Sequence, residues 1–381
     1  MSEPRIVILT TFFRPVMGGV ESNAERLARY LNTHGFPVVV VTKRVRRGWP
    51  DDDMLDGLRV LRIGPSGERD GRGKWKFTPA AARWLIGHRS QYDVVCCIDF
   101  RAIGLAGLAA RAITGRPVLF QAQTPGVFRW PLTLAYTKPD AMACIGRELE
   151  REALALGMPR ERVHFLPNPI DMAQFRPADR DERERLRASF SIPQHTVACV
   201  FVGRLSLEKG LMDVMEAWRA ARPAGAILLV AGPDMDGHAW NVGPAARAFV
   251  AAHGLDASVR FLGAVRDPAP LLRAADVFVQ PSHFEAQGLS AVEALASGVP
   301  VIASATGGLI DFVRDGVNGT LFPPKDVSAL ATGLRTLIDD AALRARLAAA
   351  ARPSVEQEYD ERVVFARFAD LVRGLSQGRA R

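Results

Sequence analysis

The sequence predicts an α/β protein made of two doubly wound parallel-sheet domains. Short apolar runs, typical of buried parallel strands, alternate with helical segments along most of the chain. Such alternation favours a parallel sheet with helices on both faces. It is interrupted at residues 168–181, where Pro169, Pro177 and the loss of periodicity indicate a linker. A length of 381 residues suits two domains of this kind.

The first domain is predicted to hold seven strands and the helices between them. The strands are expected at Arg5–Thr10, Val38–Thr42, Leu58–Ile63, Asp93–Ile98, Pro117–Ala122, Ala141–Ile145 and Arg162–Leu166. The first helix is expected to end near Asn32. Three further helices are expected at Pro79–Arg89, Gly104–Thr114 and Glu148–Leu156. Gly64–Gly73 is rich in glycine and charge, which predicts an excursion from the fold.

The second domain repeats the pattern with six strands. They are expected at Val197–Gly203, Ala226–Gly232, Val259–Gly263, Asp276–Gln280, Val299–Ala303 and Gly319–Phe322. Helices at about 326–350 and 358–374 end the chain. If the two sheets face each other, the carboxyl ends of their strands line one interdomain cleft, where ligands of such sheets bind.

Composition bounds the class of protein. No apolar run approaches the ~18 residues of a membrane-spanning helix, and the first residues lead directly into a strand without the pattern of a signal peptide. A cytoplasmic protein is expected. Four cysteines fall inside predicted strands without metal-ligand spacing, which indicates buried free thiols: Cys96, Cys97, Cys144 and Cys199.

The net charge of +8 is concentrated in one window. Residues 43–89 hold twelve Lys and Arg against six Asp and Glu, and Lys74–Phe77 and Arg83–Arg89 mix cations with aromatic or aliphatic side chains. An anionic membrane surface, which would place the protein at the inner face of the membrane, and an acidic acceptor are two possible partners. A solvated basic face remains an equal alternative. No nucleic-acid binding motif is present, so nucleic acid is not expected.

One strand–loop–helix–strand unit carries paired carboxylates. Between two buried strands, the loop holds Glu285 and the helix that starts near Gly288 holds Glu293. The amides of Gly288, Leu289 and Ser290 lie at the helix start, where they can bind an anion. Eight residues of helix span at most about 12 Å, which suits a ligand with hydroxyls at both ends and a phosphate between them. Two surface carboxylates beside an ordinary turn are the alternative.

A second loop supplies cations. Gly203–Gly210 follows an apolar strand, contains Arg204 and Lys209, and precedes a helix that begins near Leu211. A guanidinium fork and an ammonium beside a helix N-terminus suit a diphosphate. Charged loops after strands are common, so this loop is specific only in combination with the loop of Glu285.

Together the two motifs resemble a known enzyme family. Gly203-Arg-Leu-x-x-x-Lys-Gly, followed by Pro281-Ser-x-x-Glu-x-x-Gly-Leu-x-x-x-Glu-Ala-x-Ala-x-Gly-x-Pro-Val-Ile-Ala, resembles the retaining glycosyltransferases of family four. The resemblance implies the GT-B fold, two facing Rossmann-like domains with a cleft between them. It implies an acceptor-binding domain at 1–175, onto which a C-terminal helix at 356–381 packs back, and a donor-binding domain at 182–355.

The resemblance also implies roles for individual residues. Arg204 and Lys209 would stabilise the departing nucleoside diphosphate, whose growing negative charge needs preorganised cations. Glu285 would contact the donor sugar and Glu293 the ribose hydroxyls. In the loop after the first strand, Gly18 and Gly19 match the family's cover over the donor phosphates, with Gly19 nearest to them. Glu21 is expected only to support the helix dipole, and an ordinary turn remains the alternative for the glycine pair.

Two residues depart from the family pattern. Gln287 stands where an aromatic residue is usual, and its amide offers a hydrogen bond near the sugar. Gln123 stands where many members have a histidine, on the acceptor or sugar side, and glutamine cannot titrate. The family reaction is described as front-face, with the leaving phosphate taking the acceptor proton, so it needs no protein base. His283 neighbours the motif without a clear role.

The predicted function is therefore transfer of a sugar from a nucleoside diphosphate sugar to an acceptor, with retention and without metal or cofactor. A carbohydrate or a lipid-linked precursor is the expected acceptor. A nucleotide-sugar epimerase of the same fold and a non-catalytic sugar-nucleotide-binding subunit are the rivals. The glutamine at position 123 favours the last, and the presence of Arg204, Lys209, Glu285 and Glu293 speaks against it.

Overall fold

The computed structural model describes residues 2–16, 18–66, 71–98, 101–124 and 137–378, and divides the chain into two compact units. Unit 1 comprises Met1–Asn168 together with Arg362–Arg381, and unit 2 comprises Pro169–Glu361. Unit 2 is thus inserted into unit 1, and the chain passes between the units twice. The segment predicted as a linker belongs to unit 2 from Pro169 onward.

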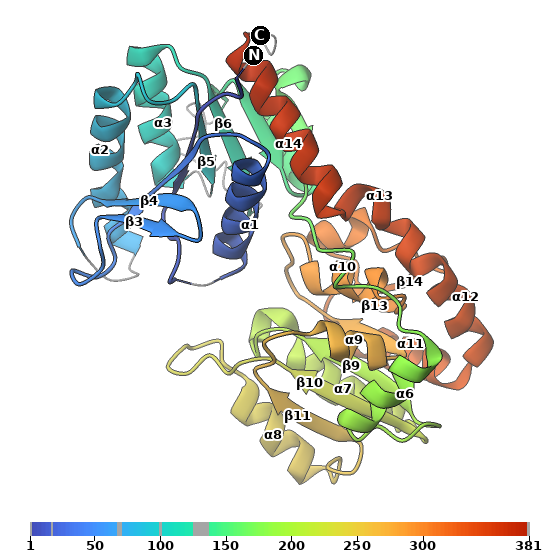
Figure 1. Cartoon of the computed structure of the whole chain (residues 1–381). Helices are drawn as coiled ribbons and strands as arrows, with labels where there is room; N and C mark the ends of the chain where they lie inside the picture. Colours follow the sequence, from blue (N-terminus) through green and yellow to red (C-terminus); the bar gives the residue numbers. More distant parts are fainter. Residues whose placement is uncertain (1, 17, 67–70, 99–100, 125–136, 379–381) are drawn as a thin grey trace. The chain divides into compact units, whose positions relative to one another are not determined.

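Unit 1 is built on an eight-stranded sheet of order β3-β4-β2-β1-β5-β6-β7-β8 (Figure 1). All pairs are parallel except β3 with β4. The strands are β1 (Ile6–Thr10), β2 (Val38–Lys43), β3 (Asp52–Leu55), β4 (Leu58–Ile63), β5 (Val94–Ile98), β6 (Val118–Ala122), β7 (Ala141–Cys144) and β8 (Val163–Phe165). The order reverses between β1 and β5, as in doubly wound sheets.

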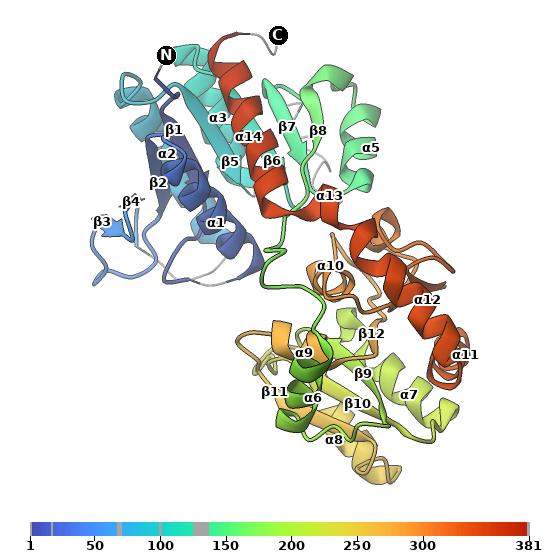
Figure 2. The ribbon, with the colours of Figure 1, turned by 45° about the vertical axis from the view of Figure 1, so that its right-hand side comes forward.

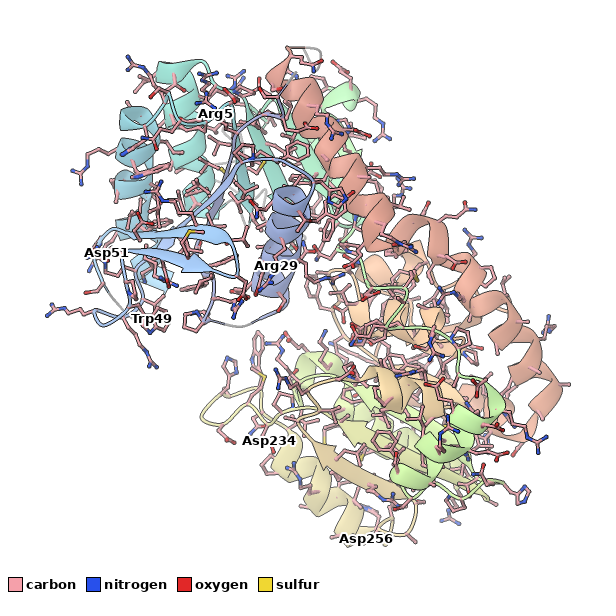
Figure 3. The ribbon with its side chains drawn as sticks, viewed as in Figure 1. Arg5, Arg29, Trp49, Asp51, Asp234 and Asp256 are labelled. Carbon is pink, nitrogen blue, oxygen red and sulfur yellow. The ribbon has the colours of Figure 1, made fainter. Side chains whose placement is uncertain are left out.

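The antiparallel strand β3 lies inside the basic window, where a loop was expected. Arg62 of β4 is 2% exposed, and its guanidinium donates to Asp53 Oδ2 at 3.0 Å and to the Pro50 carbonyl at 2.9 Å. Figure 3 shows Trp49 and Asp51 on the segment that leads into β3. The acids of this segment therefore neutralise part of the predicted basic surface: Arg44 pairs with Asp51, Arg59 with Asp52 and Arg62 with Asp53.

Helices cover both faces of this sheet (Figure 2). They are α1 (Gly19–Thr33), α2 (Gly71–Gly87), α3 (Arg101–Thr114), α5 (Arg147–Ala155), the short η1 (Arg160–Arg162) and α14 (Glu361–Ser376). Helix α2 begins eight residues before the expected Pro79 and takes up the end of the predicted excursion. Residues 67–70 and the side chains of Lys74 and Trp75 lie outside the described part.

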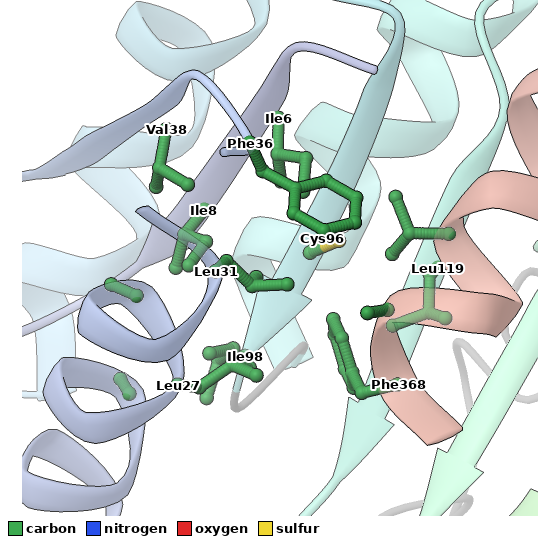
Figure 4. Close-up of a cluster of buried hydrophobic side chains, with 14 of the residues drawn as sticks. Ile6, Ile8, Leu27, Leu31, Phe36, Val38, Cys96, Ile98, Leu119 and Phe368 are labelled. Carbon is green, nitrogen blue, oxygen red and sulfur yellow. The ribbon is translucent and has the colours of Figure 1, made fainter. Parts of the chain in front are cut away.

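The C-terminal helix α14 completes the core of unit 1. Figure 4 shows Leu27 and Leu31 of α1, Ile98 of β5 and Phe368 of α14 gathered in one buried cluster. Phe368 is 2% exposed. Because these apolar side chains would otherwise face water, α14 contributes to the core of unit 1 although nearly all of unit 2 separates it from the rest of that unit in the chain.

Unit 2 has a six-stranded, wholly parallel sheet of order β11-β10-β9-β12-β13-β14. The strands are β9 (Val197–Val202), β10 (Ala226–Ala231), β11 (Val259–Gly263), β12 (Val277–Gln280), β13 (Val301–Ser304) and β14 (Gly319–Phe322). Counted within the unit, this is the 3-2-1-4-5-6 order of a dinucleotide-binding sheet, with its switch point between β9 and β12.

The helices of unit 2 differ from the expected pattern near the end of the chain. They are α6 (Arg180–Ser189), η2 (Leu207–Lys209), α7 (Leu211–Ala221), α8 (Gly243–Ala252), α9 (Ala269–Ala274), α10 (Leu289–Ala296), η3 (Gly307–Asp311), α11 (Val327–Asp339), α12 (Ala341–Ala351), η4 (Arg352–Ser354) and α13 (Glu356–Tyr359). The single helix expected over 326–350 is broken at Asp340, whose carboxylate caps α12 by accepting from the Leu343 amide at 2.8 Å. The last predicted helix is broken at Asp360, which is extended.

All four cysteines are free and buried in strands, as predicted. Their burial raises the pKa of each thiol above its ordinary value, which makes the thiolate scarce at neutral pH. Among the described residues, no helix is long and apolar enough to cross a bilayer.

Candidate functional site

The two predicted motif loops meet at the switch point of the unit 2 sheet. Strands β9 and β12 are neighbours, with Val200 opposite Phe278, and the sheet order reverses between them. The loop that carries Arg204 and Lys209 follows β9, and the loop that carries Glu285 follows β12. Both lie at the carboxyl edge of the sheet, at the place where doubly wound sheets bind ligands.

Backbone contacts hold these two loops against each other. Gly210 has a left-handed φ of 68°, and a Cβ there would lie 2.0 Å from the Pro281 carbonyl oxygen, so a side chain at this position would separate the loops. The His283 amide donates to the Glu208 carbonyl at 2.8 Å. The ring of His283 contacts Asp213 Oδ2 at 2.8 Å, which ties the second loop to the first turn of α7.

Lys209 and Glu285 form an ion pair where the loops touch. The Lys209 ammonium donates to Glu285 Oε2 at 2.6 Å, and their side chains are 19% and 10% exposed. A charge pair with so little exposure is weakly screened by solvent. Sequence reasoning named both residues but did not foresee that they bind each other.

Arg204 lies at the outer side of the same loop. Its side chain is half exposed and pairs with Glu208 within the loop. Gly203 precedes it, and a Cβ at this position would lie 3.9 Å from Lys209 Cγ. The loop therefore presents one partly buried ammonium and one exposed guanidinium, a pair suited to a diphosphate that is open to solvent on one side.

Helix α10 begins directly after the loop that carries Glu285. Gly288 is its N-cap, with a left-handed φ of 92°, and Leu309 Cδ2 lies 2.6 Å from the position of a Cβ there. The first intrahelical bonds run from the amides of Ala291 and Val292 to the Gly288 carbonyl. The amides of Leu289 and Ser290 precede them and are oriented to receive an anion.

Two side chains flank this helix start. Gln287 is buried, with 4% exposure. Glu293 lies in the second turn of α10 and is half buried. Gly308, which sequence reasoning did not single out, also holds the loop in place, because its amide donates to the Glu285 carbonyl at 3.1 Å. A pair of glycines just after β13 was the only signal in the sequence.

In unit 1, the glycine pair begins α1. Gly18 is the N-cap of α1, in extended conformation, and Gly19 is its first residue, with open space around it. Glu21 folds back over this start, so that its Oε2 lies 2.3 Å from where a Cβ of Gly18 would be. This is the dipole-supporting role expected of Glu21. Met17 of this loop lies outside the described residues.

Gln123 forms a reciprocal amide pair with Asn168. Gln123 Nε2 donates to Asn168 Oδ1 at 3.2 Å, and Asn168 Nδ2 donates to Gln123 Oε1 at 2.8 Å. Gln123 is 5% and Asn168 is 6% exposed. The pair joins the end of β6 to the last residue of unit 1 before the chain enters unit 2. The Gln123 amide has a second N–H besides the one that it donates to Asn168.

The described residues contain no group of three or more His, Cys, Asp or Glu side chains arranged to hold a metal ion. Asp234 and Asp236 are two residues apart in the loop after β10, but Asp234 Oδ2 accepts from Arg247 at 2.8 Å. Figure 3 marks Asp234 at the start of that loop.

The fold and this site define a class of protein. Two doubly wound α/β units, with a cation loop and a carboxylate loop at the switch point of the second, are the architecture of GT-B glycosyltransferases. The solved structures agree: sucrose-phosphate synthase from Thermosynechococcus elongatus matches with a TM-score of 0.82 at 23% identity, covering 98% of this chain and 100% of that one. Anabaena Alr3699/HepE in complex with UDP and glucose matches with a TM-score of 0.76 at 20% identity, covering 97% and 99%.

The chain belongs to the group 1 glycosyl transferases, that is, to glycosyltransferase family 4. The family model described as Glycosyltransferase Family 4 matches residues 17–174, and the one described as Glycosyl transferases group 1 matches residues 182–353. A D-inositol 3-phosphate glycosyltransferase of Xylanimonas cellulosilytica is 31% identical and aligned over 92% of both chains. The predicted family and GT-B fold are confirmed.

Proposed function

We propose that this glycosyltransferase moves a sugar from a nucleoside diphosphate sugar to an acceptor hydroxyl, with retention at the anomeric carbon and without a metal ion. The observation that carries the proposal is the Lys209–Glu285 pair beside the N-terminus of α10, at the switch point of unit 2. A cation for a phosphate and a carboxylate for sugar hydroxyls stand next to each other there, as the two halves of such a donor require.

In the proposed reaction, the bond between the anomeric carbon and the phosphate oxygen breaks. The acceptor oxygen bonds to the same face of that carbon, and its proton passes to the departing phosphate. Arg204, Lys209 and the amides of Leu289 and Ser290 stabilise the charge that grows on the leaving diphosphate. Glu285 orients the sugar and Glu293 the ribose. No protein base and no metal ion takes part.

The uracil nucleotide is the first donor base to test. The solved structure of Alr3699/HepE holds UDP and glucose, and that protein shares the fold of this chain. Within this chain, base recognition is expected in the loops after β10 and β11. The glutamine at position 287, where the family usually has an aromatic residue, is proposed to contact the donor sugar and to alter sugar preference.

The acceptor is proposed to carry either an anionic or an apolar part. The relative from Xylanimonas is named for a phosphorylated polyol, and the basic window of unit 1 suits an acidic acceptor. Apolar side chains also lie around the candidate site and form an apolar rim. Four adjacent strands, β10, β9, β12 and β13, are each followed by a segment that carries one large, exposed apolar side chain. They are Trp240, Leu207, Phe284 and Ile310, which are 45–50% exposed. This rim favours a lipid-linked acceptor, and trials with inositol phosphates, oligosaccharides and alkyl glycosides separate these classes.

Association with anionic membrane is proposed through the basic window of unit 1, residues 43–89. Three of its arginines are bound to Asp51, Asp52 and Asp53, which lowers its net attraction. Cosedimentation with vesicles that contain anionic lipid, against neutral vesicles, tests it. Binding that vanishes in about 0.5 M salt is expected for such a surface, and equal binding to both vesicles would contradict it.

The deciding experiment is a thermal-shift panel of nucleoside diphosphates and their sugars, without added metal. A ligand at about 100 times its Kd stabilises the folded state by about 2.7 kcal/mol. Arg204→Ala is expected to lose most of the shift. Arg180→Ala is the matched control, because Arg180 also forms an i,i+4 pair, with Glu184, on the exposed helix α6. Equal shifts in both variants would contradict the proposed diphosphate site.

An acceptor assay separates the enzyme rivals. Transfer joins the sugar to an acceptor and releases nucleoside diphosphate in equal amount. An epimerase converts the donor with no acceptor present, and a binding subunit gives a thermal shift without turnover. Turnover lost in Lys209→Ala together with Arg204→Ala supports transfer through the proposed site, whereas wild-type turnover in both would refute it.

A further inference from the structure

Three donors converge on a single oxygen of Glu285. Oε2 accepts from Lys209 Nζ at 2.6 Å, from Gln280 Nε2 at 3.0 Å and from Ser282 Oγ at 3.2 Å. Glu285 is 8%, Gln280 3% and Ser282 0% exposed, so all three side chains are almost closed to water. Among the described residues, no hydrogen bond or ion pair reaches the other carboxylate oxygen, Oε1.

The hydrogens of this cluster have one consistent assignment. A carboxylate can only accept, so the Gln280 nitrogen, and not its oxygen, must face Glu285. The second N–H of the same amide donates to Ser282 Oγ at 2.9 Å, and the Ser282 hydroxyl in turn donates to Glu285. Ser304, the last residue of the neighbouring strand β13, donates through its Oγ to the Ser282 carbonyl and so fixes the loop after β12. Both N–H groups of the Gln280 amide and the Ser282 hydroxyl are thus each used once.

Gln280 has no evident structural reason to be polar. It ends β12, whose other residues, Val277, Phe278 and Val279, are apolar and buried. Its own Oε1 is buried and, among the described residues, has no hydrogen-bond partner. An unpaired buried carbonyl costs free energy, and an apolar residue there would avoid that cost. The amide nitrogen on Glu285 is what the position gains from being glutamine.

The ion pair poses a problem that this cluster solves. In the proposed reaction Lys209 binds the donor diphosphate, and its ammonium then turns partly away from Glu285. A buried carboxylate that loses its partner is strongly disfavoured. Two neutral donors on the same oxygen keep it bound, and they leave Oε1 to accept from a sugar hydroxyl.

We propose that Gln280, together with Ser282, is a positioning residue that holds Glu285 in place while Lys209 engages the donor diphosphate. This inference rests on the proposed function and deepens it. It predicts that Gln280 acts on the sugar half of the donor and on the transfer step, but not on recognition of the nucleoside diphosphate.

The test is Gln280→Met, which keeps the length and volume of the side chain and removes both N–H donors. Gln121→Met is the matched control: Gln121 is also 3% exposed, also near the end of a central strand, and also has an unpaired buried Oε1, but it lies in β6 of unit 1. Calorimetry measures the binding of UDP and of UDP-glucose, or of another nucleoside diphosphate and its sugar if the thermal-shift panel selects one. An assay of sugar transfer to the acceptor gives kcat and KM.

For Gln280→Met, affinity for the nucleoside diphosphate is expected to stay within about twofold, the range of a neutral surface change. The sugar nucleotide is expected to lose its added affinity, and kcat to fall about 10- to 100-fold, the worth of a hydrogen bond to a charged group. Gln121→Met is expected to keep both. Ser282→Ala should act in the same direction with little change in volume, and the double variant should be less than additive because both donors serve one oxygen.

The outcomes separate the inference from the function on which it rests. A Gln280→Met enzyme with lower thermal stability but wild-type kcat and KM would make Gln280 merely structural and refute the inference alone. Equal losses in Gln121→Met would do the same. If Gln280→Met does not fold, wild-type kcat in Ser282→Ala refutes the inference. A wild-type protein that binds neither ligand would overturn both the function and the inference.

Discussion

At the scale of single residues, the Gln123–Asn168 pair shows what one departure from a family pattern does. Where relatives of this family often have a titratable histidine, this chain has a buried amide that binds a second buried amide across a reciprocal pair. The role that follows first from the geometry is to fix the last residue of unit 1 against β6. A direct role toward the sugar remains a prediction, carried by the amide's further N–H.

This role predicts a stability effect. Gln123→Ala removes both hydrogen bonds of the reciprocal pair from the buried Asn168 amide and is expected to lower the free energy of unfolding by about 1–3 kcal/mol. Asn168→Ala should cost a similar amount, and the double variant less than the sum. Urea unfolding measures all three. Gln174→Ala, which removes an exposed amide bound to Asp267, is the control and should change it by less than about 0.5 kcal/mol. Additive losses would show that the pair is not formed.

Asp140 provides a pH-dependent prediction. Burial disfavours its ionised form, but hydrogen bonds from Arg111, at 2.6 and 2.7 Å, and from the Val118 amide outweigh burial and lower its pKa. Because the folded pKa lies below the unfolded one, the stabilisation is complete at neutral pH and is lost as the pH falls through the folded pKa.

Asp140→Asn is therefore expected to cost about 1–3 kcal/mol at pH 7 and progressively less below about pH 4. Urea unfolding at pH 7, 5 and 3.5 measures this difference. Asp256→Asn, an exposed position in unit 2, is the control (Figure 3). A difference between wild type and Asp140→Asn that stays constant over this range would rule out the pairing as its source.

At the scale of elements, the tight start of α10 controls the candidate site. Gly288→Ala forces a side chain into a left-handed backbone and against Leu309 and Glu285. Gly254→Ala isolates the backbone cost, since Gly254 has a φ of 63° and nothing within 4 Å of a Cβ. The control should cost about 1 kcal/mol. Gly288→Ala should cost more and should weaken nucleotide binding at least about tenfold, as expected for a displaced anion site. Equal stability and equal nucleotide affinity in the two variants would contradict the contact with Leu309.

The elements also show how far the sequence alone carries. All six strands of unit 2 and the seven parallel strands of unit 1 were predictable, because buried parallel strands are short runs of apolar residues. Strand β3 was not, because Asp52–Leu55 is charged and half exposed, and pairs with β4 through a buried arginine. The break at Asp340 was missed because strong helix formers, mainly alanine, leucine and arginine, continue beyond it, while the cap depends on a single side chain.

The same limit applies to the site. The sequence could single out four residues as candidates because they stand in motifs with fixed spacing: Arg204, Lys209, Glu285 and Glu293. Contacts between residues distant in the chain, such as Lys209 with Glu285, are set by the order of strands in the sheet, which no local pattern encodes. Gln280 was read as the end of an apolar strand, and only its burial beside a carboxylate reveals a polar role.

At the scale of the whole molecule, the chain crosses between the units at two adjacent segments. The Ile170 amide donates to the Tyr359 carbonyl at 2.9 Å, and the Glu361 amide donates to the Ile170 carbonyl at 3.0 Å. Both ends of unit 2 are thus hydrogen-bonded to each other, and the unit has its own core around Trp218 and Leu228. An inserted unit with joined ends and a separate core has the features of a domain that folds alone.

A fragment of residues 169–361 is therefore expected to fold cooperatively. It is also expected to bind the nucleoside diphosphate that the whole chain binds, within about tenfold of its affinity, because Arg204, Lys209 and the amides at the start of α10 lie within it and only the expected cover by Gly18 and Gly19 is lost. Circular dichroism, urea unfolding and calorimetry measure this. The control is a fragment of residues 182–381, which loses the hydrogen bonds of Ile170 to Tyr359 and Glu361 and retains α14 without the rest of unit 1. The apolar face of α14, with Phe365, Phe368 and Val372, would then be exposed, so this fragment is expected to aggregate. If the first fragment is unfolded while the second is monomeric and binds, the division of the chain at 168 and 361 is wrong.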